Sequence, residues 1–339
     1  MISLTPRTSR RFRRLTLNTV ITLYCLVLAG GVVRSTGAGM GCPDWPKCFG
    51  SWVPPTKVSQ LPLDYKKIYG AKLKGEVEFN PVKTWIEYVN RLLGAFTGIM
   101  IFLTLVASIP YFTAGKRSVF YYSLVAFILV GVQGWLGSKV VSTELMPVMI
   151  TLHMLLAIVI VFLLIYLFIW AKYSETLLTR IGGKRRTMLN ITGLGVLLLS
   201  LIQILLGTQV RENMDEVINV LGYGARGAWI SELGATFYVH RSFSIVVVAA
   251  NLLWFYKIRQ DSNSALVLKR SAKWCLVLVG IELFTGILMA YFGVPPYAQP
   301  MHLTVAIALI GLQFVTWLLR GKQQFLDRDQ AESLKGEVV

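Results

Sequence analysis

The sequence predicts an all-α integral membrane protein with eight transmembrane helices, arranged as two pseudo-symmetric four-helix bundles. Three observations predict this fold. The 339-residue chain is 55% hydrophobic and only 15% charged, whereas soluble proteins carry about a quarter charged residues. The charges cluster between apolar runs of about 20 residues, which is enough to cross a bilayer. The second half of the chain repeats the first. The eight runs lie at about 15–34, 92–112, 119–138, 148–171, 188–210, 236–256, 273–293 and 301–319.

The connections between these runs predict the topology. The first run follows a basic start with no acidic residue before Asp44, and its length favours a helix over a cleavable targeting signal. A long outer loop, 35–85, precedes the second run, and a basic linker, Lys172–Arg186, separates the halves. The positive residues favour two cytoplasmic termini, in a bacterial plasma membrane rather than a mitochondrial inner membrane. This topology explains the net charge of +17 without nucleic-acid binding.

The internal repeat predicts the domain boundaries. Tyr88-Val89-Asn90-Arg91 recurs 150 residues later as Tyr238-Val239-His240-Arg241. Gly131, Gly137, Pro147 and His153 recur 149 residues later as Gly280, Gly286, Pro296 and His302. We therefore expect a first four-helix bundle at 1–173, a duplicated second bundle at 174–322 and a cytoplasmic tail at 323–339.

Two of the four cysteines lie close together in the outer loop. They are Cys42 and Cys48, in the stretch CPDWPKC. The outer side of a bacterial membrane is oxidising, which favours a disulfide. A zinc site is disfavoured because no histidine or second cysteine pair accompanies them in that loop, and two free thiols remain open. Cys25 and Cys275 fall within apolar runs and are interpreted as inert apolar side chains.

The three histidines of the chain, His153, His240 and His302, each lie near the start of an apolar run. Ionisable groups inside membrane helices are costly and are therefore functional candidates. His240 and His302 fall at a matched depth on the second and fourth helices of the second bundle. Two imidazoles in that arrangement can hold a haem iron from both sides. The alternative is that each histidine only forms hydrogen bonds within the bundle.

The equivalent positions of the first bundle hold His153 and Asn90, and an amide is a poor ligand for haem iron. Glu87 lies one helical turn before Asn90, and its counterpart in the second half is Phe237. An acid found only in the half that lacks a second ligand suggests a reactive site. The alternative is a carboxylate at the membrane surface, paired with a basic neighbour.

Other polar residues within or next to the apolar runs have two candidate roles. Arginines near the outer face either hold haem propionates or reach lipid phosphates; they are Arg34, Arg91, Arg211 and Arg241. Intramembrane glutamines are expected to form interhelical hydrogen bonds; they are Gln133, Gln203 and Gln209.

These residues resemble one known family. Residues 31–48, GVVRSTGAGMGCPDWPKC, are similar to the first-loop signature of the haem A synthases. Glu87-x-x-Asn90-Arg91 resembles the Glu-x-x-His-Arg motif of that family. His153, His240 and His302 match its other three histidines, and the resemblance covers about residues 12–320.

The resemblance implies two four-helix bundles, with haem b on His240 and His302 in the second. The first bundle would bind the substrate haem O and oxidise a ring methyl to a formyl group by successive hydroxylations. Glu87 would be the essential acid, and His153 would bind the substrate iron. The cysteine pair would form a disulfide or take part in electron transfer. Haem O synthase and oxidase assembly factors are candidate partners, and homo-oligomerisation stays open.

Asn90 departs from the family pattern, which has histidine at this position. Three interpretations follow: the substrate binds through His153 alone, Asn90 acts as a hydrogen-bond donor, or the first site is degenerate. The alternative function is a b-type membrane cytochrome that passes electrons without oxidising a substrate, because the second site alone suffices for that. A third is a transporter, which the repeat also permits.

Overall fold

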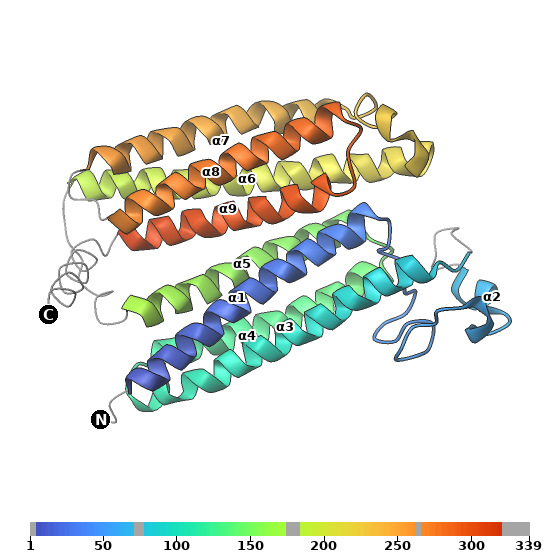
Figure 1. The fold of residues 1–339 in the computed structure, drawn as a ribbon, viewed down its shortest axis with the longest axis horizontal. Coiled ribbons are helices and arrows are strands. Elements are labelled where there is room, and N and C mark those ends of the chain that lie inside the picture. The colour runs from blue at the N-terminus through green and yellow to red at the C-terminus, as the bar shows by residue number, and fades with distance from the viewer. Residues whose placement is uncertain (1–4, 71–77, 174–183, 262–265, 321–339) are drawn as a thin grey trace, which may run out of the picture. The chain divides into compact units, whose positions relative to one another are not determined.

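The computed structural model describes residues 5–70, 78–173, 184–261 and 266–320. In these ranges the chain is built from eight long helices with short helical turns between them (Figure 1). All eight are long and apolar enough to cross a membrane, so the prediction of an all-α fold with eight membrane-spanning helices is confirmed. They are α1 (Pro6–Ser35), α3 (Pro81–Thr113), α4 (Arg117–Ser142), α5 (Pro147–Tyr173), α6 (Lys184–Leu221), α7 (Ala235–Gln260), α8 (Leu266–Tyr291) and α9 (Ala298–Arg320).

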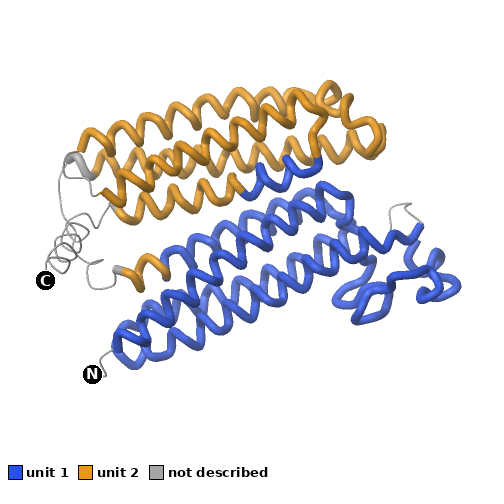
Figure 2. Tube along the Cα trace, in the orientation of Figure 1, with its two compact units in different colours: residues 1–167, 296–304 blue, residues 168–295, 305–339 orange. Residues whose placement is uncertain are grey.

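The chain divides into two compact units (Figure 2). Unit 1 contains residues 1–167 and 296–304, and unit 2 contains residues 168–295 and 305–339. Within unit 1, α3 packs against both α1 and α4, and within unit 2, α7 packs against both α6 and α8. This order is the same in both halves, as a duplication predicts. The pseudo-symmetric arrangement of two complete bundles stays a prediction, and the expected tail at 323–339 lies outside the described residues.

Helix α6 extends further than the sequence predicted. The expected outer connection began at Arg211, but the helix continues to Leu221. Arg211 and Asp215 form an ion pair of 2.7 Å one turn apart, which supports a helix. Met214 and Ile218 are buried against Trp229. An amphipathic extension packed on a buried tryptophan therefore replaces the first part of the expected loop.

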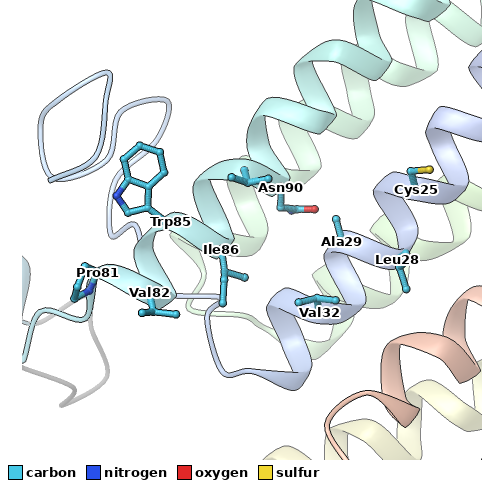
Figure 3. A pocket seen from close by; sticks show the side chains of 10 residues that line it. Cys25, Leu28, Ala29, Val32, Pro81, Val82, Trp85, Ile86 and Asn90 are labelled. Carbon is cyan, nitrogen blue, oxygen red and sulfur yellow. The ribbon is translucent and has the colours of Figure 1, made fainter. Parts of the chain in front are cut away.

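Helices α1 and α3 are joined by buried hydroxyl groups. Oγ1 of Thr19 lies 3.0 Å from Oγ1 of Thr104 and also donates to the carbonyl of Met100, so no polar atom of this contact lacks a partner. Nearer the end of α1 and the start of α3, a pocket of about 720 Å³ lies between the two helices (Figure 3). Its lining is Cys25, Leu28, Ala29 and Val32 of α1 and Pro81, Val82, Trp85, Ile86, Val89 and Asn90 of α3.

The loop between α1 and α3 is held against the first three turns of α3. Thr84 Oγ1 donates to the carbonyl of Gly41 at 2.9 Å, and the Cys42 amide donates to Glu87 Oε2 at 2.8 Å. The backbones approach so closely that a Cβ on Gly41 would lie 2.5 Å from the carbonyl oxygen of Lys83. Only glycine fits this position without displacing the loop.

Arg91 completes this attachment with all five of its N–H donors. Its Nη1 donates to the carbonyls of Asp44 at 2.6 Å and Lys47 at 3.0 Å. Its Nη2 donates to the carbonyl of Cys42 at 3.0 Å and to Glu87 Oε1, and its Nε also donates to Glu87 Oε1. Thr84, Glu87 and Arg91 follow the spacing of one helical face, so a single face of α3 binds the loop.

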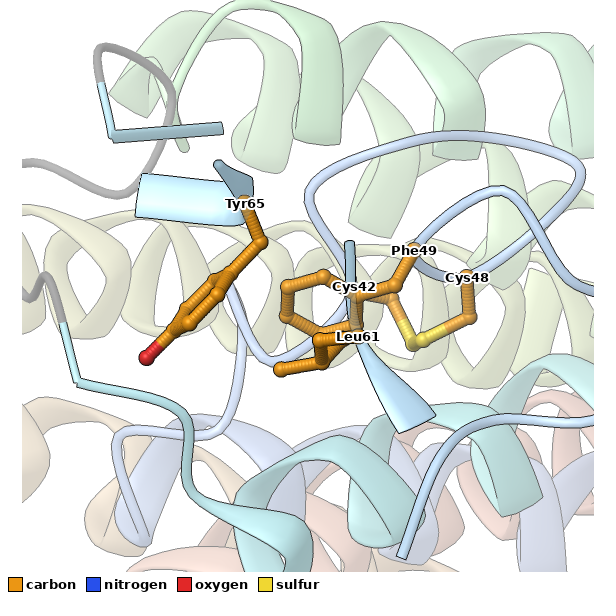
Figure 4. Packing of buried hydrophobic residues seen from close by; sticks show 5 residues of the cluster. All are labelled: Cys42, Cys48, Phe49, Leu61 and Tyr65. Carbon is orange, nitrogen blue, oxygen red and sulfur yellow. A yellow bond between two sulfur atoms is a disulfide. The ribbon is translucent and has the colours of Figure 1, made fainter. Parts of the chain in front are cut away.

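The loop has a small core of its own (Figure 4). Cys42 and Cys48 form a disulfide, so the favoured prediction for this pair is confirmed. Both sulfurs are buried against Phe49, Leu61 and Tyr65. The Asp44 carboxylate accepts from the amides of Phe49 at 2.6 Å and Gly50 at 2.8 Å, which closes the turn. The described part of the loop is thus an ordered cap with little regular secondary structure.

Replacing Arg91 with Met is expected to lower the midpoint of thermal unfolding by roughly 5 °C or more, because Glu87 then stays buried without a partner. Replacing Arg91 and Glu87 together should recover part of the loss, because no unpaired charge remains. Thermal unfolding of the detergent-solubilised protein measures both. Arg259→Met is the control at an exposed arginine of α7. Equal midpoints for Arg91→Met and this control would contradict the anchoring role of Arg91.

Candidate functional site

The four predicted ligand positions lie in the first turns of four helices. Asn90 follows the start of α3, His153 that of α5, His240 that of α7 and His302 that of α9. All four side chains are partly buried. Each of these residues therefore lies near the start of its helix, and the matched depth of His240 and His302 in the membrane stays a prediction.

In each unit, a glycine on one helix faces a candidate residue on the neighbouring helix. The two glycines occupy equivalent positions in the two units. A Cβ on Gly207 of α6 would lie 3.2 Å from Cε1 of His240, and one on Gly30 of α1 would lie 3.9 Å from Oδ1 of Asn90. Gly207 follows Gly30 by 177 residues, the same offset that separates Arg211 from Arg34. A side chain at Gly207 would therefore crowd the imidazole, whereas a Cβ at Gly30 would make only an ordinary van der Waals contact with Asn90.

His153 of α5 also lies next to a glycine of a neighbouring helix. A Cβ on Gly137 of α4 would lie 3.4 Å from Cε1 of the imidazole. The backbone carbonyl of His153 accepts a hydrogen bond of 2.9 Å from Gln133 Nε2. The ring atom Nδ1 is buried and has no hydrogen-bond partner among the described residues. A buried imidazole nitrogen without a partner is costly, so this ring is suited to binding an electrophile such as iron.

The backbone at His240 is held in the same way as the backbone at His153. Gln203 Nε2 donates to the carbonyl of His240 at 3.1 Å. The interhelical hydrogen bonds predicted for Gln133 and Gln203 are therefore confirmed, while that of Gln209 stays a prediction. The facing glycine and the polar contact fit an imidazole held for ligation. The pairing of His240 with His302 across one haem stays a prediction.

Glu87 is almost fully buried, at 3% exposure. The sequence left two interpretations open, a reactive acid or a surface carboxylate paired with a basic neighbour. The pairing with Arg91 is present, but the pair is buried beneath the loop rather than exposed. Its counterpart Phe237 packs against the cluster around Trp229, so the second unit has an apolar contact at this position.

Glu87 and Asn90 have different neighbours although one turn separates them. The Glu87 carboxylate contacts Arg91 and the Cys42 amide. The Asn90 side chain lines the pocket and points toward α1 near Ala29 (Figure 3). The sequence alone suggested one shared environment for both side chains. In the structure, the Glu87 carboxylate contacts the loop, and the Asn90 amide lines the pocket between the helices.

The four candidate propionate ligands have distinct surroundings. Every N–H of Arg91 already has an acceptor, so the structure does not support its expected contact with a propionate. Arg211 pairs with Asp215. Arg241 is exposed, with its guanidinium 5.2 Å from the ring centre of Tyr238. Arg34 lies in the last turn of α1 and is partly buried.

Sequence reasoning missed the residues that make room for the site. Gly30, Gly207 and the loop anchors Gly41 and Thr84 were not singled out. The constant offset of 177 residues that links Gly30 to Gly207 and Arg34 to Arg211 was a usable signal for the first pair. No local pattern identifies Gly41, because its partner is the backbone of a distant helix.

Comparison with known proteins agrees with this arrangement. A family model described as cytochrome oxidase assembly protein, COX15-CtaA, matches residues 13–314. That range begins in α1 and ends in α9.

Three individual relatives are each named heme A synthase. The protein from Shewanella oneidensis is 26% identical over 217 residues, covering 63% of this chain and 61% of that relative. The protein from Bartonella bacilliformis is 30% identical over 195 residues, covering 51% and 53%. The protein from Rickettsia bellii is 23% identical over 346 residues, covering 91% and 97%. This chain thus spans 61% and 53% of the length of the first two relatives and 97% of the third. Because the family model matches most of its length, the chain belongs to the COX15-CtaA family of cytochrome oxidase assembly proteins.

Proposed function

We propose that the protein is a haem A synthase, which oxidises a ring methyl of haem O to a formyl group. One observation carries the proposal: equivalent positions facing a glycine hold His240 in unit 2 and Asn90 in unit 1, and only unit 1 has an acid, Glu87, next to that position. This asymmetry suits one permanent haem site and one exchangeable substrate site. The relatives named heme A synthase support the same activity.

In the second half of the chain, His240 and His302 would hold the iron of haem b. The glycine opposite His240 and the glutamine that fixes its backbone support a fixed imidazole. When bound, haem b supplies reversible one-electron redox chemistry. The exposed guanidinium of Arg241 is the best-placed candidate to hold a propionate, because an arginine fork matches a carboxylate.

In the first unit, His153 would bind the iron of the substrate haem O. Asn90 is a poor iron ligand, so the protein would hold the substrate iron from one side only. A single protein ligand allows substrate and product to exchange, which a pair of imidazoles would oppose. Two successive hydroxylations of the ring methyl give a hydrated aldehyde, and loss of water from it leaves the formyl group. Each hydroxylation is a two-electron oxidation that adds one oxygen atom, so the reaction needs an external oxidant together with dioxygen or water as the oxygen source.

Glu87 would stabilise charge or relay protons during these steps. Its Oε1 accepts from Arg91 and its Oε2 accepts from the amide of Cys42, so both oxygens are held in fixed positions. The loop above it shields the carboxylate from bulk water, as its 3% exposure indicates.

The topology follows from the same assignment. Both termini would lie in the cytoplasm of a bacterium, because the basic segments fall on that side. The disulfide-bonded loop would then lie on the oxidising outer side, where the Cys42–Cys48 bond is stable. Haem O is the proposed substrate; contacts with haem O synthase, with oxidase assembly factors or with further copies of the chain stay predictions.

The function is tested by producing the protein in bacterial cells that make haem O but no haem A, and extracting their haems. Haem A should appear well above the level of cells without the protein. Asn90→His, which restores the histidine of the family pattern, should keep this activity. Haem b in the purified protein together with no haem A in the cells would instead favour an electron-transferring cytochrome.

The two halves of the chain are expected to respond differently to loss of their histidines. His240→Ala or His302→Ala should lower the haem b content of the purified protein several-fold, because each removes an axial ligand. His153→Ala should keep most of the haem b and lose the formyl product. Haem b is measured from the pyridine haemochrome spectrum, and equal losses in all three variants would refute this division of roles.

Replacing Glu87 with Gln should lower haem A formation by about 100-fold or more, the low end of a general acid–base contribution. Haem b content and thermal midpoint report whether the fold survives. Glu78→Gln, at an exposed acid just before α3, is the control and should behave like the unmodified protein. Full haem A formation by Glu87→Gln would remove this carboxylate from the mechanism.

A further inference from the structure

The pocket between α1 and α3 is almost entirely apolar. Nine of its ten lining residues, all except Asn90, present hydrocarbon, aromatic or sulfur surface. Its volume of about 720 Å³ lies within the range of about 300–1,000 Å³ that is typical of small-molecule sites. Neither the fold nor the proposed iron and acid chemistry requires a pocket at this position.

The pocket occupies the face of α3 that the loop leaves uncovered. The loop contacts Thr84, Glu87 and Arg91, whereas Val82 and Val89 line the pocket. At 100° per residue these two sets point in nearly opposite directions. Val82 and Val89, and Leu28 across the gap on α1, are exposed, so the rim of the pocket is apolar and open to the surroundings of the helices.

Two residues that line this apolar space, Trp85 and Asn90, each have a buried polar side-chain atom without a hydrogen-bond partner among the described residues: the donor Nε1 of Trp85 and the acceptor Oδ1 of Asn90. Oδ1 of Asn90 is buried and accepts no hydrogen bond from the described residues. Asn90 points toward α1 (Figure 3), and its Oδ1 lies opposite Gly30. An unsatisfied carbonyl oxygen in an apolar environment costs free energy. A ligand with a long apolar chain and one hydroxyl group near it would fill the space and satisfy this oxygen.

We propose that the α1–α3 pocket binds the isoprenoid chain of the substrate haem, and that the hydroxyl group beside this chain donates a hydrogen bond to Oδ1 of Asn90. The inference rests on the proposed function and extends it to substrate selection. Haem O differs from haem B by a hydroxyethylfarnesyl group, so this pocket makes the protein select haem O over haem B. Asn90 then has a positioning role that does not depend on iron ligation.

The test uses the full-length protein purified with its haem b in place, titrated with haem O or haem B and followed by absorbance. The unmodified protein should bind haem O about tenfold or more tightly than haem B, because only haem O buries an apolar chain. Ala29→Phe fills the pocket and should bring this ratio close to one, leaving haem B affinity unchanged. Ile128→Phe, at an exposed position of α4, a helix that contributes no residue to the pocket lining, should keep the ratio.

Two further variants keep the result interpretable. Ala29→Leu is a smaller change and should give an intermediate ratio if Ala29→Phe fails to fold, as judged from its haem b content. Asn90→Leu removes the hydrogen-bond acceptor and should weaken haem O binding several-fold with little effect on haem B. A ratio unchanged in the Ala29 variants would overturn the pocket assignment while leaving the proposed function intact. If neither haem binds to the unmodified protein, the proposed function itself fails.

A quinol with an apolar chain has the same chemistry, a chain beside a hydroxyl group. A third titration therefore distinguishes a quinol from the substrate haem as the ligand of the pocket. Decylubiquinol is titrated into the unmodified protein and into Ala29→Phe, with tryptophan fluorescence as the readout. Quinol binding that Ala29→Phe abolishes, with the preference for haem O kept, would assign the pocket to the quinol and overturn the proposal. Loss of the haem O preference in Ala29→Phe supports the proposal.

Discussion

The buried ion pair between Glu87 and Arg91 is the interaction on which the rest of the first unit depends. Two opposite charges removed from water are stable only when each has a partner and the remaining donors are satisfied. Arg91 meets this condition by donating to three loop carbonyls as well as to the carboxylate. The pair therefore holds the loop against α3, and the loop in turn buries the pair. Neither arrangement is stable without the other, which ties the position of the acid to the fold of the cap.

The sequence predicted the fold class well because membrane-spanning helices are specified by local composition. Eight apolar runs became eight helices, and the cysteine pair became a disulfide. The main error was at α6, where Arg211 and Asp215 interrupt the apolar run and were taken as the start of a loop. The helix continues because these charges pair with each other, and because Met214 and Ile218 pack on Trp229. Such tertiary packing leaves no clear mark on hydropathy.

The candidate site was predicted in its residues but only partly in its arrangement. His153 and His240 were identified because imidazoles are rare in membrane helices, and the structure gives each a facing glycine. The sequence placed Glu87 and Asn90 on one helix face, since three residues separate them. Three residues leave an angle of about 60° between two side chains. That angle is enough to direct one toward the loop and the other toward α1, and only the positions of both neighbours decide the outcome.

The contacts of the loop also divide by their distance along the chain, with a consequence for biosynthesis. The disulfide and the turn closed by Asp44 join residues 42–50 only, so this ring can form while the downstream chain is still being made. The contacts of Gly41 and Arg91 require α3, which is completed later. The disulfide-closed ring at residues 42–50 can thus form first, and α3 then docks onto it. Incorrect membrane insertion of α3 would leave a covalently intact ring undocked and exposed, a state that quality-control proteases can recognise.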